Sequence, residues 1–262
     1  MKTNYTIAFV LTLTLVLSSC KKDEKTTTTK TEVTTEIVKT SSELKITPIE
    51  HATMVLEYEN KVIYVDPFGG KEAFKNQKPA DLVFITDIHF DHLDLPTLDS
   101  LDLSKATIIA PLVVKNKLPE NLQRKTIVLH NGNSKTLKNV GIETVPMYNL
   151  REEALHFHAK GRGNGYVLTF GEQRVYISGD TEDIPEMRKL KNIDIAFICM
   201  NLPWTMTINS AASAVLDFKP KKVYPYHYRN KEGYSNVGQF KRIVNATTDN
   251  IEVVQLDWYK AK

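Results

Sequence analysis

The sequence carries little net charge, which argues against a nucleic-acid partner. Its formal net charge is +3 over 262 residues. The lysines are spread along the chain, and no basic stripe interleaved with aromatic residues is present to follow a phosphate backbone. Apolar residues make up 42% of the chain and charged residues 25%, as in ordinary soluble proteins. One domain of roughly two hundred residues can bury a full core without disulfides.

The apolar run near the start of the sequence is too short to span a membrane comfortably. After the basic start Met1-Lys2, Tyr5 to Leu17 gives 13 apolar or weakly polar residues, whereas a spanning helix needs about 20. This length is typical of the core of a secretory signal peptide. The run ends in Leu17-Ser18-Ser19-Cys20, which resembles a bacterial lipobox. We therefore expect a lipid on Cys20, with a plain signal peptide or an inserted anchor as the alternatives.

Cysteine is scarce, so a disulfide framework is not expected. The sequence has two cysteines, Cys20 and Cys199. If Cys20 carries lipid, Cys199 has no partner for a disulfide. Cys199 lies in the apolar run Ile195–Met200, where a buried and unreactive thiol is a better interpretation than a metal ligand.

Large apolar side chains are nearly absent from residues 21–43, which consist mainly of Lys, Thr, Glu and Ser. Such a segment cannot bury enough surface to offset its ordering entropy. We predict a signal peptide over residues 1–20, a disordered tether over 21–43 and one folded domain over 44–262. The expected location is the cell envelope, as a periplasmic or outer-membrane lipoprotein held to the membrane through Cys20.

Strand and helix patterns alternate along the predicted domain. Both halves run strands first and then helix, which favours an α/β fold with two packed sheets and helices outside. The predicted strands are Leu44–Ile49, Thr53–Tyr58, Lys61–Val65, Ala80–Ile85, Thr107–Ile109, Thr126–Leu129, Gly141–Val145, Gly165–Phe170, Arg174–Ser178, Asp194–Ile198, Lys222–Pro225 and Glu252–Gln255. The predicted helices are Leu95–Leu101, Ile184–Leu190, Thr207–Phe218 and Ser235–Asn245, the last two capped by Thr207 and Ser235.

The segment Thr86–Leu93 carries the densest set of metal-capable side chains. Asp87, His89, Asp91 and His92 fall within six residues, directly after a predicted buried strand. An extended backbone places alternate side chains on one side, so Asp87, His89 and Asp91 should share a side, and His92 joins them where the chain turns. Imidazole and carboxylate ligands suit zinc or a similar divalent ion.

This segment resembles the H-x-H-x-D-H signature of the metallo-β-lactamase superfamily, with Asp87 in place of the first histidine. Further motifs of that superfamily follow in order over residues 44 to about 258. They are Ile49-Glu50-His51-Ala52 and Val65-Asp66-Pro67-Phe68 near the start, then Val145–Asn149 before His158-Ala159-Lys160-Gly161, then Ser178-Gly179-Asp180-Thr181, and last Tyr224–Tyr228. The opening motifs look like the branch that includes ascorbate-phosphate lactonase and N-acyl-phosphatidylethanolamine phospholipase D. The resemblance implies a four-layer αββα sandwich.

The resemblance also implies a two-metal site. Its first set of ligands would be Asp87, His89 and His158, its second would be Asp91, His92 and His227, and Asp180 would bridge the two. Zinc is the expected metal. Because a carboxylate is harder than an imidazole and adds negative charge, Asp87 should lower the Lewis acidity of the first site and shift its preference toward manganese or iron. Asp91 is the candidate catalytic residue, since it can also orient the attacking water.

Several further residues are candidates for supporting the site. Asp66 is expected to accept a hydrogen bond from a ligating histidine, although a plain turn aspartate is the alternative. His51 is expected to support a metal ligand, to face the substrate, or to be a hydrogen-bonded structural histidine. His156 competes with His158 for the ligand role, and His130 is expected at the surface. The candidates for lining the substrate pocket are Tyr148, Asn149, Lys160, Trp204 and Tyr228, with Lys160 suited to an anionic group.

The function expected from these residues is metal-assisted hydrolysis of a small-molecule or lipid substrate. The two branch members named above favour a lactone or ester in one case and a phosphodiester in the other. A different class stays open because of Asp87, namely a non-catalytic metal-binding lipoprotein that keeps the fold for ligand binding.

Overall fold

The computed structural model describes residues 43–259. The predicted signal peptide, Cys20 and residues 21–42 of the predicted tether lie outside this range. Within it, no helix has the length and the apolar character that crossing a membrane requires.

The first sheet within the described residues has six strands. Strands β1, β2 and β3 pair antiparallel, and β3, β4, β5 and β6 then continue parallel to one another. Consecutive strands are neighbours throughout, in the order β1-β2-β3-β4-β5-β6. Their bounds are β1 Lys45–Glu50, β2 Thr53–Tyr58, β3 Lys61–Val65, β4 Leu82–Phe84, β5 Thr107–Ala110 and β6 Thr126–Val128.

The second sheet has seven described strands in the order β15-β12-β11-β10-β9-β8-β7. Strands β7 to β10 pair antiparallel, whereas β10, β11, β12 and β15 run parallel. A short hairpin, β13 with β14, stands apart from both sheets. The bounds are β7 Ser134–Leu137, β8 Val140–Met147, β9 Gly163–Phe170, β10 Gln173–Ile177, β11 Ile195–Cys199, β12 Lys222–Tyr226, β13 Arg229–Asn230, β14 Gly233–Tyr234 and β15 Glu252–Val253.

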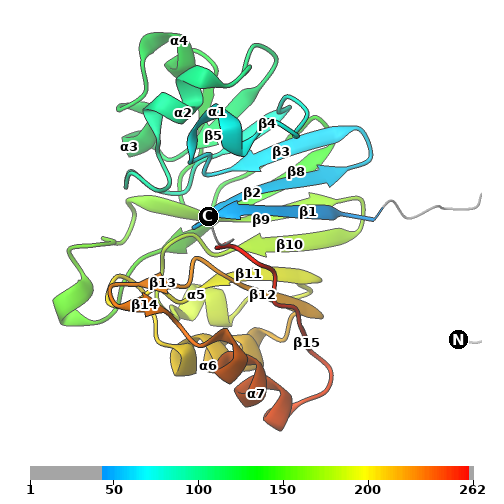
Figure 1. The fold of residues 1–262 in the computed structure, drawn as a ribbon, viewed down its shortest axis with the longest axis vertical. Helices are drawn as coiled ribbons and strands as arrows, with labels where there is room; N and C mark the ends of the chain where they lie inside the picture. The colour runs from blue at the N-terminus through cyan, green and yellow to red at the C-terminus, as the bar shows by residue number, and fades with distance from the viewer. Residues whose placement is uncertain (1–42, 260–262) are drawn as a thin grey trace, which may run out of the picture. The chain divides into compact units, whose positions relative to one another are not determined.

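Helices cover the outer side of each sheet (Figure 1). Helices α1 to α4 lie along the first sheet, and α5 to α7 along the second. The longest described helices are α6 (Ile208–Phe218) and α7 (Val237–Thr247). The others are α1 Gly70–Ala73, α2 Leu95–Ser100, α3 Leu112–Lys115, α4 Glu120–Gln123 and α5 Pro185–Arg188, with a 3₁₀ turn at Glu152–Ala154.

The sheets pack face to face because each strand sends alternate side chains to opposite faces. On β2, Leu56 joins a core shared with the second sheet, whereas its neighbour Val55 faces the helices α2 to α4. Phe84 of β4 meets Tyr166 of β9 edge to face, with ring centroids 5.0 Å apart. The resulting architecture is the predicted four-layer α/β sandwich.

The predicted elements are present, with two kinds of difference. Ser235 is not the cap of the last helix: α7 starts two residues later, Asn236 accepts the Gln239 N–H, and the Ser235 hydroxyl donates to the Met200 carbonyl instead. The second difference concerns the short elements α1, α3, α4, β7 and the β13–β14 hairpin, which the sequence did not predict because their segments show no clear apolar periodicity.

Candidate metal centre

The parallel strands of the two sheets end at the same edge of the sandwich. Asp66 follows β3 directly, and Asp87 comes three residues after the end of β4. In the second sheet, Asp180 comes after β10 and His227 directly after β12. Side chains from both sheets therefore meet where the carboxyl ends of parallel strands open into loops, which is where α/β proteins usually bind ligands.

The loop after β4 turns as expected. The backbone N–H groups of His92 and Leu93 both donate to the carbonyl of His89, at 3.0 and 2.8 Å. This turn carries His92 back toward the side chains of Asp87 and Asp91. His92 is fully buried, whereas His89 is half-buried at the surface of a cavity.

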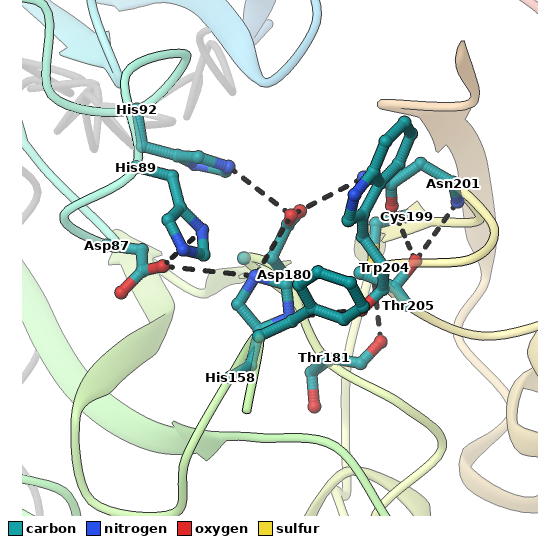
Figure 2. Close-up of polar contacts among 12 residues, drawn as sticks. Asp87, His89, His92, His158, Asp180, Thr181, Cys199, Asn201, Trp204 and Thr205 are labelled. Carbon is teal, nitrogen blue, oxygen red and sulfur yellow. Dashed lines mark hydrogen bonds and ion pairs between the residues drawn. The ribbon is translucent and has the colours of Figure 1, made fainter. Parts of the chain in front are cut away.

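The first predicted ligand set lies together. Asp87 Oδ2 is 3.0 Å from His89 Nδ1 and 3.9 Å from His158 Nε2. Figure 2 shows Asp87 beside His89, with His158 between them and Asp180. His156, the competing histidine, is exposed and packs on Phe157. The structure therefore brings His158 rather than His156 to the other two side chains.

The second predicted set is tighter. His227 Nε2 lies 3.3 Å from His92 Nε2, 3.3 Å from Asp91 Oδ2 and 3.2 Å from Asp180 Oδ1. His92 Nε2 lies 3.5 Å from Asp180 Oδ2. Ligand atoms of a tetrahedral zinc site are about 3.4 Å apart, given metal–ligand bonds of about 2.1 Å. The spacing of His92, Asp180 and His227 therefore fits a single divalent ion, and Asp91 approaches this group through His227.

Asp180 stands between the two sets. Its Oδ2 is 3.4 Å from His158 Nε2, while its Oδ1 faces His227. Both His158 Nε2 and Asp180 Oδ1 are buried, and neither has a hydrogen-bond partner among the described residues. Buried polar atoms normally have partners, and bound cations would supply a partner to each of these two atoms.

Neighbouring groups hold two of the histidines in place. Asp66 Oδ2 lies 2.8 Å from His92 Nδ1, and the Thr86 backbone and hydroxyl both donate to Asp66 at 2.7 Å. This is the contact predicted for Asp66, and it leaves His92 Nε2 facing Asp180. His158 Nδ1 lies 3.1 Å from the Trp204 carbonyl, and Asn149 donates to that same carbonyl at 2.7 Å. Trp204 and Asn149 therefore support His158.

The backbone is strained at the candidate centre. His51, Asp66 and His227 have φ values of 52°, 43° and 46°, in the left-handed region that residues other than glycine rarely adopt. Gly179, with φ 62°, leaves no room for a side chain, because an added Cβ would lie 2.7 Å from the Met147 sulfur. Strain of this kind is common where a function constrains the chain.

Carboxylates and imidazoles control each other's charge in the second set. Burial opposes protonation of His92, but the Asp180 and Asp66 carboxylates outweigh it and raise the pKa of His92 well above its usual value. Burial likewise opposes ionisation of Asp180, yet His227 and His92 hold the pKa of Asp180 well below its usual value. Nearby positive charge therefore stabilises the buried, ionised carboxylates, and a metal ion can supply this charge in place of a proton.

A cavity of about 780 Å³ opens onto these side chains. Both metal-ligand sets reach it through His89, Asp91, His158, Asp180 and His227. Its apolar walls come from Phe68, Phe90, Phe157 and Trp204, and its polar lining includes Glu50, His51, Asn201, Arg229 and Asn230. His51 therefore faces the cavity. Burial, followed by the nearby His227, lowers the pKa of His51 to about 4, so its ring is neutral at pH 7.

Four of the residues predicted to line the pocket lie outside its lining. Lys160 donates to Glu186 at 3.0 Å, and Tyr148 donates to the other oxygen of the same carboxylate at 2.9 Å. Glu186 thus holds both side chains away from the cavity. Tyr228 packs edge-on against Tyr259 instead, and Asn149 lies behind Trp204, bonded to its carbonyl. Of the five candidates, only Trp204 is part of the lining.

The structure also adds residues that the sequence did not single out. Arg162 pairs with Asp87 through two hydrogen bonds, at 3.0 and 2.7 Å. Phe68 and Phe90 meet edge to face at the cavity, with ring centroids 6.1 Å apart. The only sequence signal for these residues is their closeness to the motifs, which does not show which way their side chains point.

Comparison with known proteins places this arrangement in a family. The model of the beta-lactamase superfamily domain matches residues 45–227. A UPF0173 metal-dependent hydrolase from Pyrobaculum islandicum is 32% identical over 194 residues, covering 68% of this chain and 81% of the relative. A second UPF0173 metal-dependent hydrolase, from Pyrococcus horikoshii, is 28% identical over 223 residues, covering 81% and 96%.

A solved structure agrees with these relatives. The crystal structure of a protein named as a metal-dependent hydrolase from Parabacteroides distasonis superposes with a TM-score of 0.73 at 41% identity. The match covers 82% of this chain and 93% of that one. The chain therefore belongs to the beta-lactamase superfamily and is a metal-dependent hydrolase with the metallo-β-lactamase fold.

Proposed function

We propose that this hydrolase uses two divalent metal ions to cleave a lactone, an ester or a phosphodiester. The proposed ligands of the first ion are Asp87, His89 and His158, those of the second are Asp91, His92 and His227, and Asp180 bridges both. The observation that carries this proposal is the place of Asp180, whose two oxygens approach His158 Nε2 at 3.4 Å and His227 Nε2 at 3.2 Å. One carboxylate thus reaches both ligand sets.

When bound, such a pair of ions supplies Lewis acidity and makes water a strong nucleophile at neutral pH. The chain's own residues then orient the reaction. Burial opposes ionisation of Asp91, but His92 and His227 outweigh it and lower the pKa of Asp91 below its usual range. Asp91 is therefore an ionised hydrogen-bond acceptor that faces the cavity, and it is suited to orient the attacking water.

The cavity supports the proposed substrate classes. Phe68, Phe90 and Trp204 offer an apolar wall beside the ligand sets, which suits the carbon skeleton of an ester or lactone. The exposed Arg229 lies in the same lining and suits the anionic oxygens of a phosphodiester. Neutral His51 can hydrogen-bond either substrate. The resemblance to the lactonase and phospholipase branch supports the same two classes.

The metal proposed for the site is zinc, with manganese or iron as the alternatives. Each proposed position combines imidazole nitrogen with carboxylate oxygen, and all three ions accept this donor set. Metal analysis of the purified protein identifies the ion, and reconstitution with each metal in turn shows which of them supports turnover.

The proposal is tested by a hydrolysis panel of esters, lactones and phosphodiesters with the purified protein. We expect two ions per chain and turnover of one substrate class. His158→Ala should lower kcat/KM by more than about 100-fold, because even the partners of metal ligands are worth about 10- to 100-fold. The control is His130→Ala, at an exposed position outside the cavity lining. Metal binding without any hydrolysis would instead support the non-catalytic alternative.

We also propose a lipid anchor on Cys20, which would hold the hydrolase in the cell envelope. The support is the sequence Leu17-Ser18-Ser19-Cys20 after an apolar run of signal-peptide length. Cells expressing the full chain should incorporate labelled palmitate into it, and the protein should fractionate with membranes. Cys20→Ala should abolish both results, whereas Cys199→Ala, which changes a buried thiol, should preserve them. Labelling that survives Cys20→Ala contradicts the proposal.

A further inference from the structure

Arg162 forms a two-pronged ion pair with one of the proposed metal ligands. Its Nε donates to Asp87 Oδ1 at 3.0 Å, and its Nη2 donates to Asp87 Oδ2 at 2.7 Å. The same Nη2 donates to the Phe157 carbonyl and lies 3.4 Å from His89 Nε2. Bidentate arginine–carboxylate pairs are among the strongest hydrogen-bonded contacts in proteins. The guanidinium is therefore fixed against the first ligand set.

Water screens this pair poorly. The Asp87 side chain has no exposed surface, and the Arg162 side chain is 18% exposed. Charges in such a setting act on each other more strongly than at the surface, since the effective dielectric is lower. The positive charge of Arg162 therefore attracts the Asp87 carboxylate and repels any cation that Asp87 would hold.

The second ligand set has no such counter-charge. Within residues 43–259, the ion-pair partners of Asp91 and Asp180 are histidines, namely His92, His158 and His227. A cation at the second position therefore meets two carboxylates that no arginine or lysine has neutralised. A cation at the first position shares Asp180, but its own carboxylate, Asp87, has both oxygens already engaged by Arg162.

We infer that Arg162 makes the two positions unequal, so that the second fills first and the first holds its ion weakly. This inference rests on the proposed two-metal function. It also corrects the expectation that Asp87 adds net negative charge to the first site, because the Arg162 guanidinium offsets that charge. The Asp87–Arg162 pair together is neutral, as an imidazole ligand is.

The test is zinc titration of the chelator-stripped full chain in competition with a chromophoric chelator. The native protein should bind one zinc ion tightly and a second more weakly. Arg162→Gln should tighten the weaker step by about 10-fold or more, because it removes a poorly screened positive charge beside the ion. Arg162→Lys keeps the positive charge, so its second step should stay weak. The control is Arg174→Gln, which breaks a similar bidentate pair with Glu143 at the far end of β10 from Asp180.

Thermal unfolding gives a second measurement that does not depend on the titration. Because a ligand stabilises the state that binds it, saturating zinc should raise the Tm of Arg162→Gln more than that of the native protein. Equal affinities at the two positions of the native protein would overturn the inference alone. A weaker second step in Arg162→Gln would do the same, since Arg162 would then be a residue that positions Asp87. Failure of the native protein to bind zinc, manganese or iron would instead overturn the proposed function.

Discussion

At the scale of the residue, Asp66 fixes the orientation and the tautomer of the His92 ring. Its carboxylate accepts from His92 Nδ1 at 2.8 Å and is itself held by Thr86. Asp66→Asn keeps the shape but removes the charge that fixes the ring's tautomer. We expect metal affinity at the second position to fall about 10- to 100-fold, measured by chelator competition.

A matched variant separates this effect from general damage. Asp81 also accepts a backbone N–H, that of Val62 at 2.9 Å, but lies before β4 rather than at the centre. Asp81→Asn should leave metal affinity unchanged while lowering stability. If the Asp66→Asn protein binds metal as tightly as the native chain, Asp66 does not orient His92 for metal binding.

Cys199 gives a prediction about reactivity. Its thiol is fully buried, and burial raises its pKa to about 12. The thiolate is the reactive form, so at pH 8 the folded protein should leave Cys199 unlabelled by a thiol reagent over hours. Unfolding in denaturant should expose it to complete labelling. The Cys20→Ala chain is the sample to use, because it leaves Cys199 as the remaining cysteine. Fast labelling of the folded protein would contradict the burial described here.

The structure brings the candidate ligand side chains together as the sequence predicted, whereas their surroundings were predicted poorly, for a physical reason. Asp87, His89 and His92 are close in the chain, so local geometry constrains them. The Arg162–Asp87 pair joins residues 75 positions apart, and no local pattern reports such a contact. Lys160 was expected at the pocket because it follows His158, but Glu186, on α5, pairs with it.

At the scale of the element, α6 depends on its first residue. The Thr207 hydroxyl accepts the N–H of Ser210 at 3.0 Å, which satisfies one of the unpaired donors at the helix start. Thr207→Ala should lower the free energy of unfolding by about 1 kcal/mol, measured by urea denaturation. Thr247→Ala, in the exposed last turn of α7, should change it far less. If both variants lost the same free energy of unfolding, Thr207 would have no specific capping role.

Elements with a clear pattern were predicted almost to the residue. The bounds of β2 and β3 match the prediction, since both strands are apolar runs joined by a tight turn. Short elements escaped prediction. The four-residue helices α3 and α4 each follow a proline. Such short helices are stabilised by packing against the first sheet rather than by their local sequence.

At the scale of the whole molecule, the proposed ions join the two sheets. The loops after β3 and β4 supply one part of the centre, and those after β8, β10 and β12 supply the other. A metal that binds only the folded state, at 100 times its Kd, stabilises it by about 2.7 kcal/mol. Removal by chelator should therefore lower the Tm by about 5 to 10 °C for a domain of this size. Asp180→Asn should show a much smaller drop, and an unchanged native Tm would count against bound metal.

The fold class was predictable because the order of strands and helices leaves few ways to cover two apolar sheets. The meeting of Asp180 with His92 was predicted from the family resemblance, and it agrees with the topology, which places the carboxyl ends of the parallel strands at one edge. The exact depth of the cavity and the presence of Phe68 and Phe90 in its lining do not follow from topology, since they depend on loop conformations.

The distance along the chain between the proposed ligands has a consequence for when the protein can bind metal during synthesis and folding. His92 and His227 approach to 3.3 Å although 135 positions separate them. Until β12 has been synthesised, a growing polypeptide lacks His227, which follows that strand directly. We therefore expect the group of His92, Asp180 and His227 to bind its ion late, after both sheets have formed. The compartment in which the chain completes its folding would then set which ions are available to it.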